Sequence, residues 1–543
     1  MSREYGDFQT PLPLVEEIIA SLNMSGKRWT RVLEPTCGRG NFIQGLLKQA
    51  VPPAEIVGIE IQKAHVDCAC LVACEVTTSQ VSIKHADFFT LNLQQDIQWK
   101  QGGPLLVLGN PPWVTNAELG VLGSNNLPRK RNIKGLQGLE ALTGKANFDI
   151  AEYIWLKLMK ELASEEPTIA LLCKTSVARN ILQFASDTNL RIRSAFIRKI
   201  DAKKWFGAAV EACLFCVEMG TGEQRLEIPV YPDLFTITPE YVAGIVKGGQ
   251  LVMSVAEHQR IAHIEGVSPL TSRQGVKHDA ASIMELVYNA EGMLHNKLGE
   301  LVIVEPDYVY PLLKGSDLFS EKQKAFQKAV LVTQKCLGED TRALERIAPQ
   351  LWQYLNTHRE VFQRRKSSIY QGKPAFSMFG IGDYSFAPYK VGISGLHKAP
   401  RFRAIGLQNG KPVMLDDTCY FLPCSSAEQA AFLTSLLNDP LCKEFIRSIA
   451  FIDAKRPITK KLLQRIDLRI LYEEVDHVLL KERMLKELQG LGAAADLEAI
   501  EKCSLERYFV EYPDAETTKM RTCYAIETLF PDDMTLAPIL VHE

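Results

Sequence analysis

The segment Asn110-Pro111-Pro112-Trp113 could hold a planar amine, and it ends the apolar run 105–109. Its hydrogen-bond acceptors are the side-chain carbonyl of Asn110 and the backbone carbonyl of Pro111. The two prolines fix their own φ angles and lack N–H donors, so the turn is stiff and rich in acceptors. Trp113 could stack on the ring that carries the amine. Such a site suits the attack of an exocyclic amine on an electrophile, with a nucleobase or an amide as the substrate.

Three strand-like runs precede this turn, and each ends in residues that could bind a ligand. The run 30–34 leads into the glycine-bearing segment 35–42, the run 56–61 ends in Glu60-Ile61, and the run 83–89 contains Asp87-Phe88. Open α/β sheets bind ligands at the carboxyl ends of their strands, and glycines there allow a close backbone approach. An acid could hold a ribose diol, while a carboxylate beside a phenyl ring suits an adenine. The spacing matches neither GxGxxG nor a phosphate-binding P-loop.

The segments EPTCGRGNF, IVGIEI, ADFF and NPPW, which follow YGDFQTP in that order, resemble those of the S-adenosylmethionine-dependent DNA amino-methyltransferases. Their order is similar to the gamma arrangement, in which cofactor motifs come first, the catalytic motif next and the target-recognition domain last. The resemblance continues in NFDIAE, in the run 168–174 and in VEACLF. It implies an α/β fold: a doubly wound seven-stranded methyltransferase sheet, followed by a C-terminal α+β target-recognition domain and a helical tail. It also implies S-adenosyl-L-methionine as the cofactor.

The resemblance assigns roles to particular positions. The implied cofactor-binding residues are Thr10, Pro11, Glu34, Thr36, Cys37, Gly38, Glu60, Ile61, Asp87, Phe88 and Asn110. The implied catalytic residues are Asn110, Pro111, Pro112 and Trp113. Within the cofactor set, Glu60 would bind the ribose, and Asp87 with Phe88 would bind the adenine. A second face for the target base would come from Phe148 or Phe215. Adenine N6 is favoured over cytosine N4 because enzymes of the cytosine type more often have Ser in place of Asn110.

Hydrophobic patterning predicts three regions. Alternating strands and helices up to about residue 220 predict the catalytic domain, which we assign to residues 1–235. Less regular, basic and aromatic segments suit a DNA-binding target-recognition domain at 236–470. Beyond it, the spacing of Leu, Glu and Lys predicts a helical C-terminal region at 471–543.

Any nucleic-acid surface of this chain must be local, because the formal net charge is −2. Nine Lys and Arg against two acids lie between positions 359 and 403, and five against one lie between 129 and 145. We therefore expect phosphate contacts from Arg129, Lys130, Arg131, Arg364, Arg365 and Lys366. The expected partner is double-stranded DNA.

The remaining sequence features concern location and alternatives. There is no signal peptide and no apolar run of about 18 residues, and the thirteen cysteines suggest reduced thiols, so we expect a cytoplasmic protein without a metal. A stand-alone methylase is typical of the modification half of a restriction–modification or phage-defence system, acting as a monomer beside a separately encoded restriction endonuclease. The alternatives are a methyltransferase for protein glutamine or RNA adenine, and a non-catalytic DNA-specificity subunit.

Overall fold

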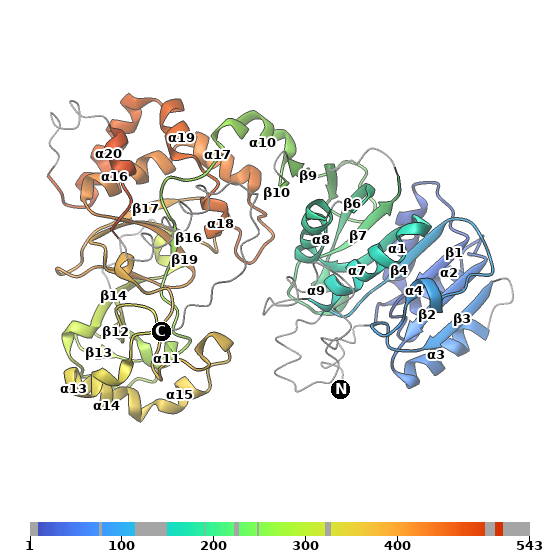
Figure 1. Ribbon diagram of the computed structural model, residues 1–543, viewed down its shortest axis with the longest axis horizontal. Helices are drawn as coiled ribbons and strands as arrows, with labels where there is room; N and C mark the ends of the chain where they lie inside the picture. Colours follow the sequence, from blue (N-terminus) through green and yellow to red (C-terminus); the bar gives the residue numbers. More distant parts are fainter. Residues whose placement is uncertain are drawn as a thin grey trace, which may run out of the picture. The chain divides into compact units, whose positions relative to one another are not determined.

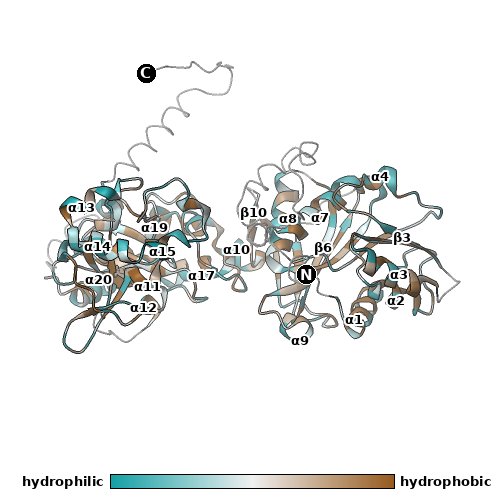
Figure 2. Cartoon of the chain, turned by 90° about the horizontal axis from the view of Figure 1, so that it is seen from below, coloured by the Kyte–Doolittle hydropathy of each residue, from teal (hydrophilic) through white to brown (hydrophobic). Residues whose placement is uncertain are grey.

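The computed structural model describes residues 9–74, 79–113, 149–188, 190–221, 227–246, 249–320, 327–494 and 505–513. The chain divides into two compact units, residues 1–259 and 260–543 (Figure 1). Each unit has its own sheets and its own core. In both units the helices carry hydrophobic and hydrophilic residues side by side, as expected for helices with one face on a sheet and the other in solvent (Figure 2).

The first unit alternates strands and helices. Its strands are β1 Arg31–Glu34, β2 Glu55–Glu60, β3 Gln80–His85, β4 Leu105–Gly109, β5 Thr168–Lys174, β6 Ile192–Ile200, β7 Ala212–Met219, β8 Glu227–Tyr231, β9 Tyr241–Val246 and β10 Gln250–Val252. Its helices are α1 Leu12–Asn23, α2 Asn41–Leu47, α3 Lys63–Cys74, α4 Leu93–Asp96, α7 Ile150–Glu161, α8 Thr175–Asp187 and α9 Ala202–Phe206, with α10 Val255–Ile261 at its end.

These strands form one sheet in the order β10-β9-β8-β6-β7-β5-β4-β1-β2-β3. From β3 to β5 all neighbours are parallel, whereas β7 is antiparallel to both β5 and β6. The seven strands expected from the sequence are therefore consecutive in the sheet, and the predicted doubly wound fold is confirmed. β8, β9 and β10 extend the sheet at the β6 edge, so the first compact unit continues beyond the predicted boundary at residue 235.

The central parallel strands β1, β2 and β4 are buried on both faces, which explains why their sequences are largely apolar, whereas β3 at the edge of the sheet is partly exposed. Val32 and Leu106 pack into a cluster with Leu14 of α1 and Ile43 of α2. Leu33, the residue that follows Val32 in β1, is equally buried but lies outside that cluster. The carboxyl ends of β1, β2, β3 and β4 consequently meet at one edge of a rigid sheet.

The second unit contains two smaller sheets, ordered β11-β19-β16-β17 and β13-β12-β15-β14-β18. The strands are β11 Arg273–Gln274, β12 Glu285–Tyr288, β13 Leu294–His295, β14 Val309–Leu313, β15 Lys328–Leu331, β16 Tyr389–Ser394, β17 Phe402–Ile405, β18 Met414–Leu415 and β19 Cys419–Cys424. The helices are α11 Ala281–Met284, α12 Gly315–Phe319, α13 Leu344–Ile347, α14 Pro349–Thr357, α15 Arg359–Gln363, α16 Ala427–Leu437, α17 Pro440–Ile449, α18 Lys460–Leu463, α19 Leu468–Glu474 and α20 His477–Gly490.

Helices α19 and α20 fulfil the expectation of helical structure beyond residue 470. α20 packs against α16, so this part of the predicted tail belongs to the second compact unit. No helix among the described residues combines the length and the apolar character needed to cross a membrane.

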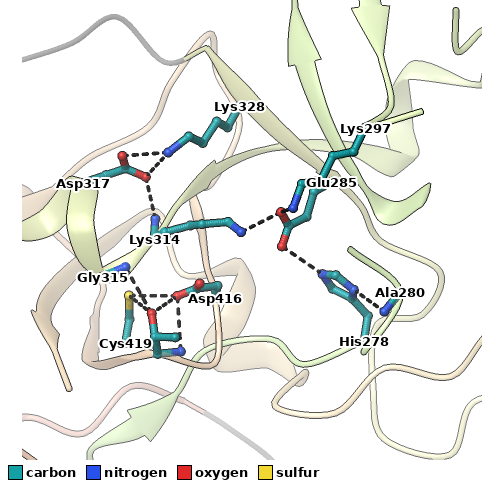
Figure 3. Close-up of polar contacts among 11 residues, drawn as sticks. His278, Ala280, Glu285, Lys297, Lys314, Gly315, Asp317, Lys328, Asp416 and Cys419 are labelled. Carbon is teal, nitrogen blue, oxygen red and sulfur yellow. Dashed lines mark hydrogen bonds and ion pairs between the residues drawn. The ribbon is translucent and has the colours of Figure 1, made fainter. Parts of the chain in front are cut away.

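A group of charged side chains lies inside the second unit, and we call it the polar cluster (Figure 3). Its members are His278, Glu285, Lys297, Lys314, Asp317, Lys328, Asp416, Thr418 and Cys419. Oε2 of Glu285 lies 2.6 Å from Nζ of both Lys297 and Lys314. Nζ of Lys328 lies 2.8 Å from Asp317. Because Lys314 directly follows β14, the cluster ties the strands of the five-stranded sheet to one another.

Candidate active site

The strand ends of the first unit border one open cavity of about 890 Å³. Ten of the residues implied by the resemblance line it, namely Thr10, Glu34, Thr36, Cys37, Gly38, Glu60, Ile61, Asp87, Phe88 and Asn110. Pro112 also lines the cavity, whereas Pro11, Pro111 and Trp113 do not. Residues from four strand ends and from the N-terminal segment are thus brought together.

The loop between β1 and α2 forms the floor of the cavity. Gly38 and Gly40 have φ angles of +52° and +87°, which favour glycine. A Cβ added to Gly38 would lie 2.7 Å from the end of the Gln9 side chain, which would have to move away. The loop therefore exposes its backbone to the cavity immediately before the N-terminus of α2.

Glu34 is the buried acid of the cavity wall, with 2% of its surface exposed. Its Oε2 has no hydrogen-bond partner among the described residues, and the same is true of Oγ1 of Thr36. Burial raises the pKa of Glu34 well above its usual range, and the nearby Glu60 raises it further. A buried carboxyl oxygen without a partner at a cavity is a group that a bound cation or donor can satisfy.

Glu60 holds the neighbouring loop while lining the same cavity. Its Oε2 accepts a hydrogen bond from Gly38 N at 2.9 Å, and its Oε1 accepts one from Gln62 N at 2.7 Å. Each carboxylate oxygen has a second lone pair, so these contacts leave acceptor capacity for a ligand hydroxyl. The carboxylate predicted to bind the ribose thus also shapes the glycine loop.

Asp87 and Phe88 follow β3 at the far end of the cavity. Asp87 Oδ1 accepts a hydrogen bond from Phe89 N at 2.9 Å, which fixes the side chain in a local turn. Phe88 is buried and Ile61 is exposed, and both line the cavity together with Asp87. A cavity with an acid, a phenyl ring and an aliphatic side chain suits a flat heterocycle with an amino group.

The N-terminal segment contacts both the loop between β1 and α2 and the catalytic turn. Gln9 Oε1 accepts from Arg39 N at 3.1 Å, and Thr10 O accepts from Asn41 Nδ2 at 2.7 Å. Thr10 Oγ1 also accepts a hydrogen bond from Asn110 Nδ2 at 3.2 Å. Thr10 is therefore the residue that joins the cofactor loop to Asn110. This contact orients the Asn110 amide so that its nitrogen faces Thr10.

The structure places Trp113 differently from the prediction. Its ring is buried, belongs to the hydrophobic core and lies edge to face with Phe206, with ring centroids 5.2 Å apart. A large apolar ring at the end of a buried strand gains more from such packing than from exposure. The alternative aromatic Phe215 is likewise in the core, beside Trp155, and Phe148 lies outside the described residues.

Several cavity residues were not singled out from the sequence. They are Gln9, Pro35, Asn41, Phe42, Ile59, Gln62, His65, Ala86, Phe89, Ile150 and Ile154. Most lie inside the motifs quoted from the sequence, so assigning whole motifs to the site rather than single positions would have included them. Ile150 and Ile154 are spaced by one helical turn on α7, and this pattern by itself indicates only a buried helix face.

The predicted DNA contacts in the second unit separate into two kinds. Arg364 and Lys366 are exposed, and Arg364 pairs with Glu360 on α15 at 2.7 Å. Arg365 instead points inward, and the prediction of a phosphate contact for it is corrected. Its guanidinium donates to backbone carbonyls and stacks 3.7 Å from the ring of Tyr370. The acceptors are the carbonyl oxygens of His278, Phe362, Ala375 and Ser377. Arg129, Lys130 and Arg131 lie outside the described residues.

Comparison with known proteins agrees with this fold and cavity. The chain is 38% identical over 469 residues to the Type II methyltransferase M.NspV of Nostoc sp. (strain ATCC 29411 / PCC 7524), covering 86% of this chain and 97% of that protein. The solved structure of the Type IIL restriction-modification enzyme MmeI in complex with DNA matches 93% of this chain and 75% of its own, with a TM-score of 0.51 and 12% identity. No model of a protein family matches the chain.

The sheet order and the acid-lined cavity at its carboxyl edge, together with these relatives, define a methyltransferase that uses S-adenosyl-L-methionine. The chain belongs to the Type II methyltransferases, which are DNA methyltransferases of restriction–modification. The family resemblance seen in the sequence is thereby confirmed. The residues fit the cofactor, because unpartnered buried oxygens and acidic groups face a cavity that would receive a cationic, hydroxyl-rich ligand.

Proposed function

We propose that this chain methylates N6 of adenine in double-stranded DNA at a specific sequence. The observation that carries the proposal is the position of Asn110, which ends β4 and lines the same cavity as the cofactor residues. A base amine held by this side chain would face the methyl donor. The alternatives, protein glutamine and RNA adenine, present similar amines and are distinguished by the experiment below.

The turn itself performs the positioning. S-adenosyl-L-methionine supplies an electrophilic methyl group when bound. The Asn110 side-chain carbonyl and the Pro111 backbone carbonyl would accept hydrogen bonds from the two amine hydrogens, which keeps the nitrogen lone pair directed at the methyl carbon. The amine nitrogen would gain the methyl group that the bound donor supplies, and it would then release one proton to water. Pre-aimed dipoles of this kind stabilise the charge that develops on the amine.

A base inside a duplex cannot reach such a cavity, so we propose that the target adenine leaves the stack during the reaction. Extrusion costs a few kcal/mol. Because Trp113 is packed against Phe206, we assign the initial contact with the base to Asn110 and Pro112, which line the cavity. Of the six residues predicted to contact phosphates, Arg364 and Lys366 are the candidates that remain among the described residues.

The biological setting follows from the same class. We propose that the chain modifies host DNA beside a separately encoded restriction endonuclease, acts as a monomer and works in the cytoplasm. Light scattering of the protein on a DNA duplex checks the stoichiometry, and a dimer would contradict the monomer.

The test is to sequence DNA from cells that express the wild-type chain or Asn110→Ala, with detection that separates N6-methyladenine from N4-methylcytosine. We expect one sequence motif to carry N6-methyladenine in the wild type only. N4-methylcytosine would correct the base. Absence of any modified DNA motif, with methylated RNA or protein instead, would overturn the proposal.

A further inference from the structure

Lys174, the last residue of β5, contacts both ends of the chain segment that separates the catalytic turn from α7. Its Nζ donates to the backbone carbonyl of Trp113 at 3.3 Å and lies 2.8 Å from Oδ2 of Asp149. The two side chains are largely buried, with 22% and 6% of their surfaces exposed. A buried ammonium needs an anionic partner, and Asp149 provides it.

Asp149 also belongs to the wall of the cofactor cavity through its helix. Its Oδ1 accepts a hydrogen bond from Ala151 N at 3.0 Å and caps the N-terminus of α7. Ile150 and Ile154 of the same helix line the cavity. The Lys174–Asp149 pair therefore joins this wall to the end of the catalytic turn.

The chemistry of the turn explains why such a contact matters. β4 and β5 pair only as far as Gly109 and Leu171, so the turn lies beyond the hydrogen-bonded part of the sheet. Pro111 and Pro112 have no N–H groups and cannot anchor the turn as donors. The turn is instead held through acceptors, and a charge-assisted hydrogen bond to the Trp113 carbonyl is a strong one.

We propose that Lys174 is a positioning residue for methyl transfer, which holds the far end of the acceptor turn while Asp149 fixes its ammonium. This inference rests on the proposed role of the turn in binding the target amine. Lys174 does not touch the substrate. Its effect would arise because a displacement of the Pro111 carbonyl by a fraction of an ångström misdirects the amine.

The test compares Lys174→Met with a matched ion-pair variant, Lys27→Met. Lys27 pairs with Glu218, which lies opposite Thr168 at the other end of β5 and β7. Both variants remove a partly buried lysine from an ion pair that includes one residue of the paired strands β5 and β7, Lys174 in one case and Glu218 in the other. Single-turnover methyl transfer is measured with enzyme in excess, saturating methyl-labelled S-adenosyl-L-methionine and unmethylated plasmid DNA. Binding of S-adenosylhomocysteine is measured by calorimetry.

We expect Lys174→Met to lower the transfer rate about 10- to 100-fold, the usual effect of slight misplacement of reacting groups. Its affinity for S-adenosylhomocysteine should stay within about threefold of the wild type, which is the pattern of a lost transition-state contact. Lys27→Met should transfer at the wild-type rate. A Lys174→Met rate equal to that of Lys27→Met would overturn the proposal and leave Lys174 with a structural role only.

Two conservative variants decide the matter if Lys174→Met does not fold. Asp149→Asn keeps the cap on Ala151 N but removes the charge and the acceptor oxygen that faces Lys174, and it should slow transfer. Lys174→Arg keeps a cationic donor and should transfer faster than Asp149→Asn; the reverse order would contradict the proposal. These readouts are ratios to the wild type, whereas failure of the proposed function would appear in the wild type itself, as absence of N6-methyladenine.

Discussion

Two buried glutamates, one in each compact unit, have opposite electrostatic surroundings. Among the described residues Glu34 in the cofactor cavity has no cationic partner, and burial raises its pKa well above the usual range. Glu285 in the polar cluster is also buried, but hydrogen bonds from Lys297 and Lys314 outweigh that effect and lower its pKa. The same residue type therefore faces a cavity in one unit and holds an ion-pair network in the other. The two pKa shifts have opposite directions because the cationic partners of Glu285, Lys297 and Lys314, are residues of the chain itself.

The largest expected effect concerns the cavity. Asn110→Ala should lower methyl transfer by about 10³-fold or more, because it removes a pre-aimed acceptor at the reacting amine. Cofactor affinity should change little, since the other cavity residues remain. Single-turnover rates and calorimetric binding test the two statements separately. Loss of cofactor affinity with an unchanged rate at saturation would move Asn110 out of the catalytic role.

A matched pair of substitutions tests the comparison directly. Glu285→Gln leaves Lys297 and Lys314 without their shared anion and should destabilise the fold by about 3 kcal/mol. Glu34→Gln replaces an acid that favours its neutral form by a neutral amide, and should change the free energy of unfolding by less than about 0.5 kcal/mol. Urea-unfolding midpoints of the two variants provide the measurement. Equal shifts of the urea-unfolding midpoint would show that the ion pairs of Glu285 do not make it more important for stability than Glu34.

The adjacent arginines of the second unit extend the comparison to DNA binding. Arg365→Ala removes the donor to four backbone carbonyls and should lower stability by about 2 kcal/mol. Arg364→Ala should leave stability unchanged, weaken DNA binding and reduce its salt dependence by roughly one phosphate. Fluorescence anisotropy at several salt concentrations and urea unfolding separate the two. If Arg364→Ala changes neither affinity nor salt slope, Arg364 makes no phosphate contact.

The smallest expected effect is the pH dependence of cofactor binding. The raised pKa of Glu34 means that the cofactor-free protein holds this proton to higher pH than an ordinary glutamate. A cationic ligand favours the ionised acid, so its binding releases a proton and its affinity rises with pH, by at most about tenfold per pH unit. The rise should occur between the pKa values of Glu34 with and without ligand. Calorimetry in buffers of different ionisation enthalpy measures how many protons are released when the cofactor binds. Glu34→Gln should abolish this release.

The strand ends of the first unit were predictable because short-range chemistry determines them. Apolar runs of four to six residues predict buried strands, and the parallel sheet brings their carboxyl ends to one edge. For that reason Glu34, Glu60, Asp87 and Asn110 line one cavity, as their order in the sequence predicted. The extension by β9 and β10 was not predicted, because nothing local marks which edge of a sheet a later strand will join.

The sequence by itself determined the methyltransferase class, the cofactor and the residues around the cavity, since each motif combines a strand with the polar group that follows it. Only the tertiary structure showed the packing of Trp113 and the partners of Arg365 and Lys174. A tryptophan, an arginine or a lysine can each face a ligand, solvent or the core. Which of these occurs depends on partners distant in the chain, such as Phe206 for Trp113 and the carbonyl of Ser377 for Arg365. Local composition carries no information about those partners, because folding alone brings them within contact distance.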